Sequence, residues 1–191
     1  MNKFLIALAV SAALPLSAQA ADHLSYNYAQ ANYVTSHSDA PDDADGWGLK
    51  ASVAVLPSMH VFGDFNRQTL DDSKRDVDTW RVGVGYNRAI NQATDVVARL
   101  AYQQQDPELS HHLPGMSAEV GLNTAYGEHM QVYGALGWED YTRTKGVNPK
   151  GEFFGRLGLL AKYNQNWSVN ASLKYDVDGN IEVQAGPRFS W

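Results

Sequence analysis

The chain has 191 residues, a formal net charge of −6 at neutral pH and no cysteine. The acidic balance argues against nucleic acid as a partner, and a chain without cysteine forms neither disulfides nor thiolate metal sites. No stretch after residue 20 is apolar enough for a transmembrane helix, which excludes a helical membrane protein but leaves a transmembrane barrel open, because half of a barrel's strand positions face a polar lumen.

The first twenty residues are typical of a secretory signal peptide. A basic start at Lys3 precedes an apolar run over residues 4–16, and Ala18 and Ala20 form the small-x-small pattern of a cleavage site. The apolar run is too short for a membrane helix, which needs about 20 residues. We therefore expect residues 1–20 to be removed after export and residues 21–191 to form a single domain.

The rest of the chain alternates apolar and polar residues in about ten segments, each of about the ten residues that a tilted strand needs to cross a membrane. The clearest segment is 167–176, in which every second residue from Trp167 to Tyr175 is apolar. The same alternation recurs at 47–55, 80–87, 96–103, 116–123, 131–139, 153–163 and 181–191, and more weakly at 60–66. Residues 24–34 are ambiguous, because Tyr26 and Tyr28 fall in the register opposite to the other apolar residues.

The connections between these segments alternate in length. Short ones lie at 56–58, 87–94, 127–129 and 164–166, whereas longer, charged ones lie at 35–44, 70–77, 104–115 and 143–150. The last connection contains Asp178-Gly179, which is typical of a tight turn. Short periplasmic turns and longer outer loops are the pattern of outer-membrane barrels. The sequence therefore predicts a closed, antiparallel, up-and-down barrel of ten strands, with eight strands as the alternative.

The segment that ends in Phe189-Ser190-Trp191 resembles the terminal assembly signal of bacterial outer-membrane barrels, with Gly186, Phe189 and Trp191 at its key positions. The alternative is an edge strand of a soluble β-domain. The resemblance implies that the barrel-assembly machinery is a partner and that the protein resides in the outer membrane, in contact with its lipid and lipopolysaccharide.

Aromatic residues gather near both ends of the predicted strands, as in the two interfacial girdles of a membrane barrel. One group lies toward the long loops and comprises Trp47, Trp80, Tyr102, Trp138, Phe153 and Tyr175. The other lies toward the short turns and comprises Tyr86, Tyr126, Tyr163, Trp167 and Trp191.

The positions predicted to face the lumen are rich in charge. The cations are Lys50, Arg81, Arg99, Arg156, Lys162, Lys174 and Arg188, and the carboxylates are Asp64, Glu119, Glu139, Asp176 and Glu182. These residues indicate either a selective channel with a charged constriction or an ion-paired plug. We favour the plug, because a barrel of eight to ten strands has little more interior room than its side chains fill.

Two loop features indicate other chemistry. Carboxylates at Asp39, Asp42, Asp43 and Asp45, and again between residues 71 and 78, are oxygen ligands suited to divalent cations that bridge lipopolysaccharide phosphates. Their spacing matches no defined calcium loop, so solvated acidic loops are the preferred interpretation and no metal or cofactor is predicted.

The pair His111-His112 follows Ser110 in a long loop and suggests an outer-membrane hydrolase, either a protease of the omptin type or a lipid deacylase. A hydrolase needs a nucleophile or water, a base and a group that orients the base. Neither a Gly-x-Ser-x-Gly nor a His-Glu-x-x-His element occurs. We therefore predict no enzymatic activity and no catalytic residues.

Four stretches of the chain carry a family resemblance: residues 24–28 (LSYNY), 33–34 (YV), 42–49 (DDADGWGL) and 60–63 (HVFG). Over residues 24–66, where the likeness is strongest, the chain resembles a xanthomonad family of small outer-membrane barrels named for a proposed activator of a plant immune receptor. It implies an exported barrel, often carried on vesicles and linked to signalling or virulence, and supplies no catalytic residues. We expect a structural or surface-interaction role, with a narrow passive channel as the alternative and a hydrolase as the second alternative.

Overall fold

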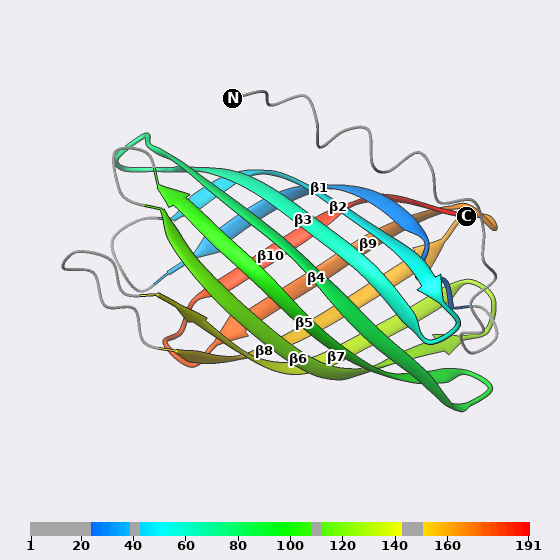
Figure 1. Ribbon diagram of the computed structural model, residues 1–191. Coiled ribbons are helices and arrows are strands. Elements are labelled where there is room, and N and C mark those ends of the chain that lie inside the picture. Colours follow the sequence, from blue (N-terminus) through cyan, green and yellow to red (C-terminus); the bar gives the residue numbers. More distant parts are fainter. Residues whose placement is uncertain (1–23, 39–42, 108–111, 143–150) are drawn as a thin grey trace, which may run out of the picture.

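The computed structural model describes residues 24–38, 43–107, 112–142 and 151–191. Ten strands form one closed antiparallel barrel, in which each strand pairs with its neighbours in the sequence and the first pairs with the last (Figure 1). They are β1 (Tyr28–His37), β2 (Ala44–Leu56), β3 (Met59–Leu70), β4 (Asp76–Asn91), β5 (Thr94–Pro107), β6 (Leu113–Tyr126), β7 (Met130–Tyr141), β8 (Glu152–Lys162), β9 (Trp167–Asp176) and β10 (Ile181–Ser190). The ten-strand prediction is confirmed, and the eight-strand alternative is wrong.

Alternation along each strand sorts the side chains between the lumen and the outer surface, because successive residues point to opposite faces. In β1, the strand that the sequence left ambiguous, Tyr28, Gln30, Asn32 and Val34 are buried while the residues between them are exposed. Tyr28 therefore points into the lumen, and the apolar outward set of this strand begins at Ala29.

The two ends of the barrel differ in their connections (Figure 1). At the short-turn end, β2 joins β3 and β4 joins β5 through two residues each, at 57–58 and 92–93. At the other end, which we call the long-loop end, the connection that joins β9 to β10 is the predicted tight turn. There Asp176 Oδ1 accepts hydrogen bonds from the backbone N–H groups of Asp178 and Asn180, and Gly179 adopts a φ of 93° that favours glycine.

Strand pairing runs further into the predicted loops than the sequence pattern indicates. The loop expected at 104–115 is partly strand, because Gln104 pairs with Pro114 and Gln105 with Leu113. The turn expected at 87–94 is paired as far as Asn91 and Thr94. Alternation marks only the part of a strand whose two faces differ in polarity, so these polar extensions gave no signal.

The outer surface of the barrel carries a broad apolar band. Leu136 on β7 is 73% exposed and Leu157 on β8 is 63% exposed, and valine, leucine and methionine side chains of the other strands continue the band. Aromatic side chains lie outward at its margins, where Trp167 contacts Phe189 at one margin and Trp80 contacts Tyr102 at the other. Among the described residues there is no helix of the length and hydropathy needed to span a membrane.

Candidate functional site: the barrel lumen

A first ion pair in the lumen joins neighbouring strands. Asp64 on β3 lies directly opposite Arg81 on β4 in the strand register. The Arg81 guanidinium donates from Nε to Asp64 Oδ2 at 2.7 Å and places its Nη2 2.5 Å from the same oxygen. The side chains are 14% and 10% exposed respectively, so this pair is held in the barrel interior rather than at its surface.

The carboxylate of Glu119 on β6 is the centre of a second group. Arg99 on β5 donates from Nη1 to Glu119 Oε1 at 3.0 Å, and the Tyr133 hydroxyl on β7 donates to the same oxygen at 2.9 Å. Arg156 on β8 places Nε 3.5 Å from Glu119 Oε2. The Glu119 side chain, 3% exposed, thus links four consecutive strands from inside the barrel.

A third ion pair joins strands that are not adjacent. Lys174 on β9 donates from Nζ to Glu139 on β7 at 2.6 Å and so reaches past β8. Such a contact is available only because a narrow barrel brings the inward faces of nearby strands close together.

The remaining lumen residues that the sequence singled out are arranged differently. Arg188 has no carboxylate within ion-pair distance among the described residues; it donates from Nε to Gln30 Oε1 at 2.7 Å and lies 3.9 Å from the centre of the Tyr28 ring. Glu182 accepts a hydrogen bond from Gln184. Lys162 lies at the short-turn end of β8, outside these groups.

The lumen also contains aromatic rings, to which the sequence analysis assigned no role. Arg81 and Arg99 both lie 5.4 Å from the centre of the Phe62 ring, and Lys174 lies 4.8 Å from that of Phe154. Cations over ring faces are attracted by the negative face of the π system. The alternation of the sequence places Phe62 and Phe154 on the inward face. Inward phenylalanines among inward arginines were the feature from which these cation–π contacts could have been predicted.

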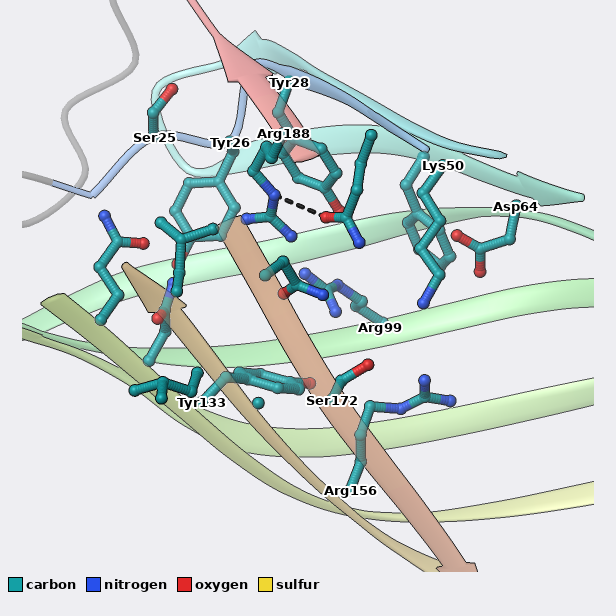
Figure 2. A pocket seen from close by; sticks show the side chains of 18 of the residues that line it. Ser25, Tyr26, Tyr28, Lys50, Asp64, Arg99, Tyr133, Arg156, Ser172 and Arg188 are labelled. Carbon is teal, nitrogen blue, oxygen red and sulfur yellow. Dashed lines mark hydrogen bonds between the residues drawn. The ribbon is translucent and has the colours of Figure 1, made fainter. Parts of the chain in front are cut away.

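The lumen holds two cavities, one toward each end of the barrel. The inner cavity, toward the short-turn end, has a volume of about 90 Å³ and is drawn in Figure 2. The outer cavity, toward the long-loop end, has a volume of about 430 Å³. Four side chains line both cavities and form what we call the partition: Lys50, Asp64, Arg81 and Arg156.

The segment before β1 fills the inner end of the lumen. Tyr26 is 4% exposed, donates its hydroxyl to Asp95 Oδ2 at 2.8 Å and stacks on the His60 ring with centres 4.7 Å apart. Leu24 is also buried. This arrangement could not be predicted from the sequence. The pattern of apolar residues over 24–28 does not show whether their side chains point into the lumen or outward.

The loop candidates lie outside the lumen. His112 Nδ1 is 2.6 Å from Asp106 Oδ1 at the exposed rim, whereas Ser110 and His111 lie outside the described residues. Asp43 contacts His37, and Asp39 and Asp42 also lie outside the described residues. In the described part of the chain, no group of three His, Asp or Glu side chains is placed to hold a metal ion.

The residues of the predicted assembly signal lie at the seam between β10 and its neighbours. Phe189 points outward, contacts Trp167 of β9 and stacks on Trp191 with ring centres 6.3 Å apart. The backbone N–H of Trp191 donates to the carbonyl of Asn27 at 3.2 Å. Gly186 lies opposite Asn170 in the register, and a Cβ there would collide with the Ala31 backbone of β1.

No protein-family model matches the chain, and no curated protein matches it. Solved structures similar to it include the KdgM porin, with a TM-score of 0.46 and 10% identity, covering 85% of this chain and 99% of that one. The translocator domain of the autotransporter NalP from Neisseria meningitidis has a TM-score of 0.48 and 10% identity, covering 90% and 91%. Neisserial surface protein A has a TM-score of 0.44 and 14% identity, covering 86% and 95%. Similarities of this size concern the barrel form and say nothing about activity.

Proposed function

We propose that this protein is a small outer-membrane barrel with a structural or surface-interaction role, whose lumen is closed by its own side chains. The observation that carries the proposal is that the lumen space is divided into two cavities, of about 90 and 430 Å³, and that Lys50, Asp64, Arg81 and Arg156 line both of them. A barrel divided in this way has no wide path for solutes, so its interactions are made by its outer surface and its long-loop end.

The outer surface supports placement in a membrane. Exposed Val120, Leu136 and Leu157 belong to a continuous apolar band, and water-exposed apolar patches of this extent are unusual in soluble proteins. Closure of β1 on β10 leaves no unpaired sheet edge, which is what a sheet needs in lipid. Outer-membrane lipid and lipopolysaccharide are the partners that this band fits, and the barrel-assembly machinery is the partner that would insert it.

The lumen supports closure. Ion pairs and cation–π contacts hold Arg81, Arg99 and Arg156 across the interior, and Tyr26 occupies the inner end. A side chain that contacts two or more partners must break more interactions to leave its position in the lumen than a side chain without such contacts. The described contacts therefore favour a plug that stays in place over a gate that opens readily.

A narrow passive channel is the second candidate. It is favoured by the arrangement of the two cavities, which lie on either side of the partition and share its four side chains. Water and small ions would then pass if the Lys50 side chain moved aside, since it is the one member of the partition with no hydrogen bond or ion pair to a described residue. Steady conductance without sugar permeation would identify this second function.

Reconstitution distinguishes these functions. Purified barrel in liposomes is tested for sugar-driven swelling, and the same protein is tested for conductance in planar bilayers. We expect neither swelling nor steady conductance from the native protein. The double variant Asp64→Ala/Arg81→Ala removes one ion pair from the partition without changing net charge, and it should produce conductance.

The matched control removes an ion pair of the same kind from the exposed side of the same two strands. Arg67 on β3 and Asp78 on β4 are register partners, joined at 2.5 Å. Arg67→Ala/Asp78→Ala should leave the native behaviour unchanged. Swelling by the native protein with sugars of the size that open porins admit would contradict the closed lumen.

A further inference from the structure

The inner cavity is surrounded by an excess of positive charge. Its lining includes five cations, each from a different strand: Lys50, Arg81, Arg99, Arg156 and Arg188. Figure 2 shows Lys50, Arg99, Arg156 and Arg188 around this space. Only two carboxylates pair with this set, Asp64 with Arg81, and Glu119 with Arg99 and Arg156.

Two of the five cations have no carboxylate partner. Lys50 makes neither a hydrogen bond nor an ion pair within 4 Å to any described residue, although Asp64 is its partner in the strand register. Arg188 uses its Nε for Gln30 and stacks on Tyr28, and neither of these partners carries a compensating charge. The lining of the inner cavity therefore has five cations and a single carboxylate, Asp64, whereas Glu139 and Glu182 line the outer cavity.

A third cation retains an unused donor. Arg156 Nε is buried and makes no hydrogen bond to a described residue; the Glu119 Oε2 oxygen of its ion pair, 3.5 Å away, is likewise without a hydrogen bond. Buried donors in proteins nearly always have a partner. A group that accepts from Arg156 and carries negative charge would satisfy this donor and reduce the excess charge at once.

The geometry points to the inner cavity as a binding site for one small inorganic oxyanion, of which phosphate is the simplest example. Guanidinium groups present paired donors that match the oxygens of such an anion, and Lys50 supplies an ammonium group from the partition. A volume of about 90 Å³ holds a single small anion with a few waters, since one water needs only about 10–15 Å³ when volume is measured as the space open to the centre of a water molecule.

The test measures the unfolding of the native barrel in detergent micelles by urea. Sodium phosphate is titrated against a bulky organic sulfonate buffer at equal ionic strength. A ligand that binds only the folded state raises stability with its concentration, so the urea midpoint should rise with phosphate and not with the sulfonate. Calorimetric titration of the folded barrel with phosphate measures the same binding without unfolding.

Lys50→Gln should weaken phosphate binding about tenfold or more, the loss expected for one charge-assisted hydrogen bond. Lys50→Arg should retain most of it. The matched control is Lys74→Gln, which removes the same charge from the exposed connection between β3 and β4, where Lys74 is 74% exposed; it should bind phosphate as the native chain does.

Three results would overturn the site: no phosphate effect in the native protein, an equal effect in Lys50→Gln, or equal stabilisation by chloride, which would reduce the effect to charge neutralisation without oxyanion recognition. If Lys50→Gln does not fold, calorimetry on the native chain and on Lys50→Arg decides the question. The measurements are made in micelles, so they are independent of whether the barrel conducts or closes a membrane.

Discussion

Arg99 and Glu119 are direct cross-strand partners of β5 and β6, and their side chains meet inside the barrel with Nη1 and Oε1 3.0 Å apart. The pair follows from alternation, because both residues occupy inward positions of adjacent strands. Tyr133 and Arg156 extend it across two further strands. Glu119 therefore joins strands in the middle of the chain through side chains, in addition to their backbone ladder.

Glu119→Gln tests how much this group stabilises the barrel. The amide keeps the shape but loses the charge, which leaves Arg99 and Arg156 without their carboxylate. Breaking a buried ion pair costs about 3–5 kcal/mol, so we expect a loss toward the lower end, about 3 kcal/mol, in urea unfolding followed by tryptophan fluorescence.

The control for this variant is Asp78→Asn, which breaks the pair with Arg67 on the more exposed side of the barrel. Exposed pairs contribute about 0–1 kcal/mol. Equal losses in the two variants would mean that lumen water screens Glu119 as fully as solvent screens Asp78.

Tyr26→Phe tests the inner end of the lumen. The substitution removes only the hydroxyl that donates to Asp95 at 2.8 Å, and keeps the ring that stacks on His60. Loss of one partner from a buried hydrogen bond costs about 1–3 kcal/mol, and we expect a decrease of that size in the free energy of unfolding. Tyr163→Phe, at a tyrosine that is 85% exposed, should change it little.

A double-mutant cycle with Asp95→Ala, which removes the acceptor, separates this hydrogen bond from other effects. If Tyr26 acts through Asp95, the two substitutions together should cost less than the sum of their separate costs. Additive costs would show that the Tyr26 hydroxyl acts independently of Asp95.

The outward and inward faces of the strands could be predicted from the sequence because polarity and geometry share the same two-residue period. Lys174 and Trp167 illustrate this, since one was placed in the lumen and the other on the outer surface by counting alone. Strand number followed from the same period together with the spacing of turns.

The partners of individual lumen charges could not be predicted in the same way. Arg188 was expected to meet a carboxylate and instead contacts Gln30 and Tyr28. Its surroundings depend on the closure of β10 on β1, a contact between the two ends of the described chain. Polarity patterns predict which face of the sheet a residue occupies, but not its position along the barrel axis or its neighbours across the lumen. The partition and the position of Tyr26 at the inner end of the lumen could therefore be seen only in the structure.

Trp191→Ala tests the predicted assembly signal. Trp191 is exposed and contacts Phe189, but contributes no ion pair or side-chain hydrogen bond among the described residues. We therefore expect normal refolding in detergent but a several-fold lower yield of folded, heat-modifiable protein in cell membranes. Trp47→Ala changes an aromatic residue near the other margin of the apolar band, 47% exposed, and should not lower the yield as much. If both variants lose the same yield of folded protein, Trp191 acts only as an interfacial aromatic residue and is not part of an assembly signal.

Leu136→Arg tests whether the apolar band lies in lipid. Leu136 is the most exposed leucine of the described barrel, at 73%, and lies in the middle of β7. An arginine at the midplane of a membrane barrel costs about 2–4 kcal/mol, whereas one beyond the interface costs close to nothing. In lipid vesicles, Leu136→Arg should therefore lower the free energy of unfolding by about 2–4 kcal/mol.

The matched substitution is Val177→Arg, at a residue of similar exposure, 65%, in the connection between β9 and β10. This position lies beyond the aromatic margin that Tyr175 marks, so an arginine there stays in water and should leave stability unchanged. The difference between the two variants depends on depth in the bilayer, because both add the same charge to an exposed apolar site. If the two variants are equally stable in vesicles, the band is not embedded in lipid and the outer-membrane assignment fails.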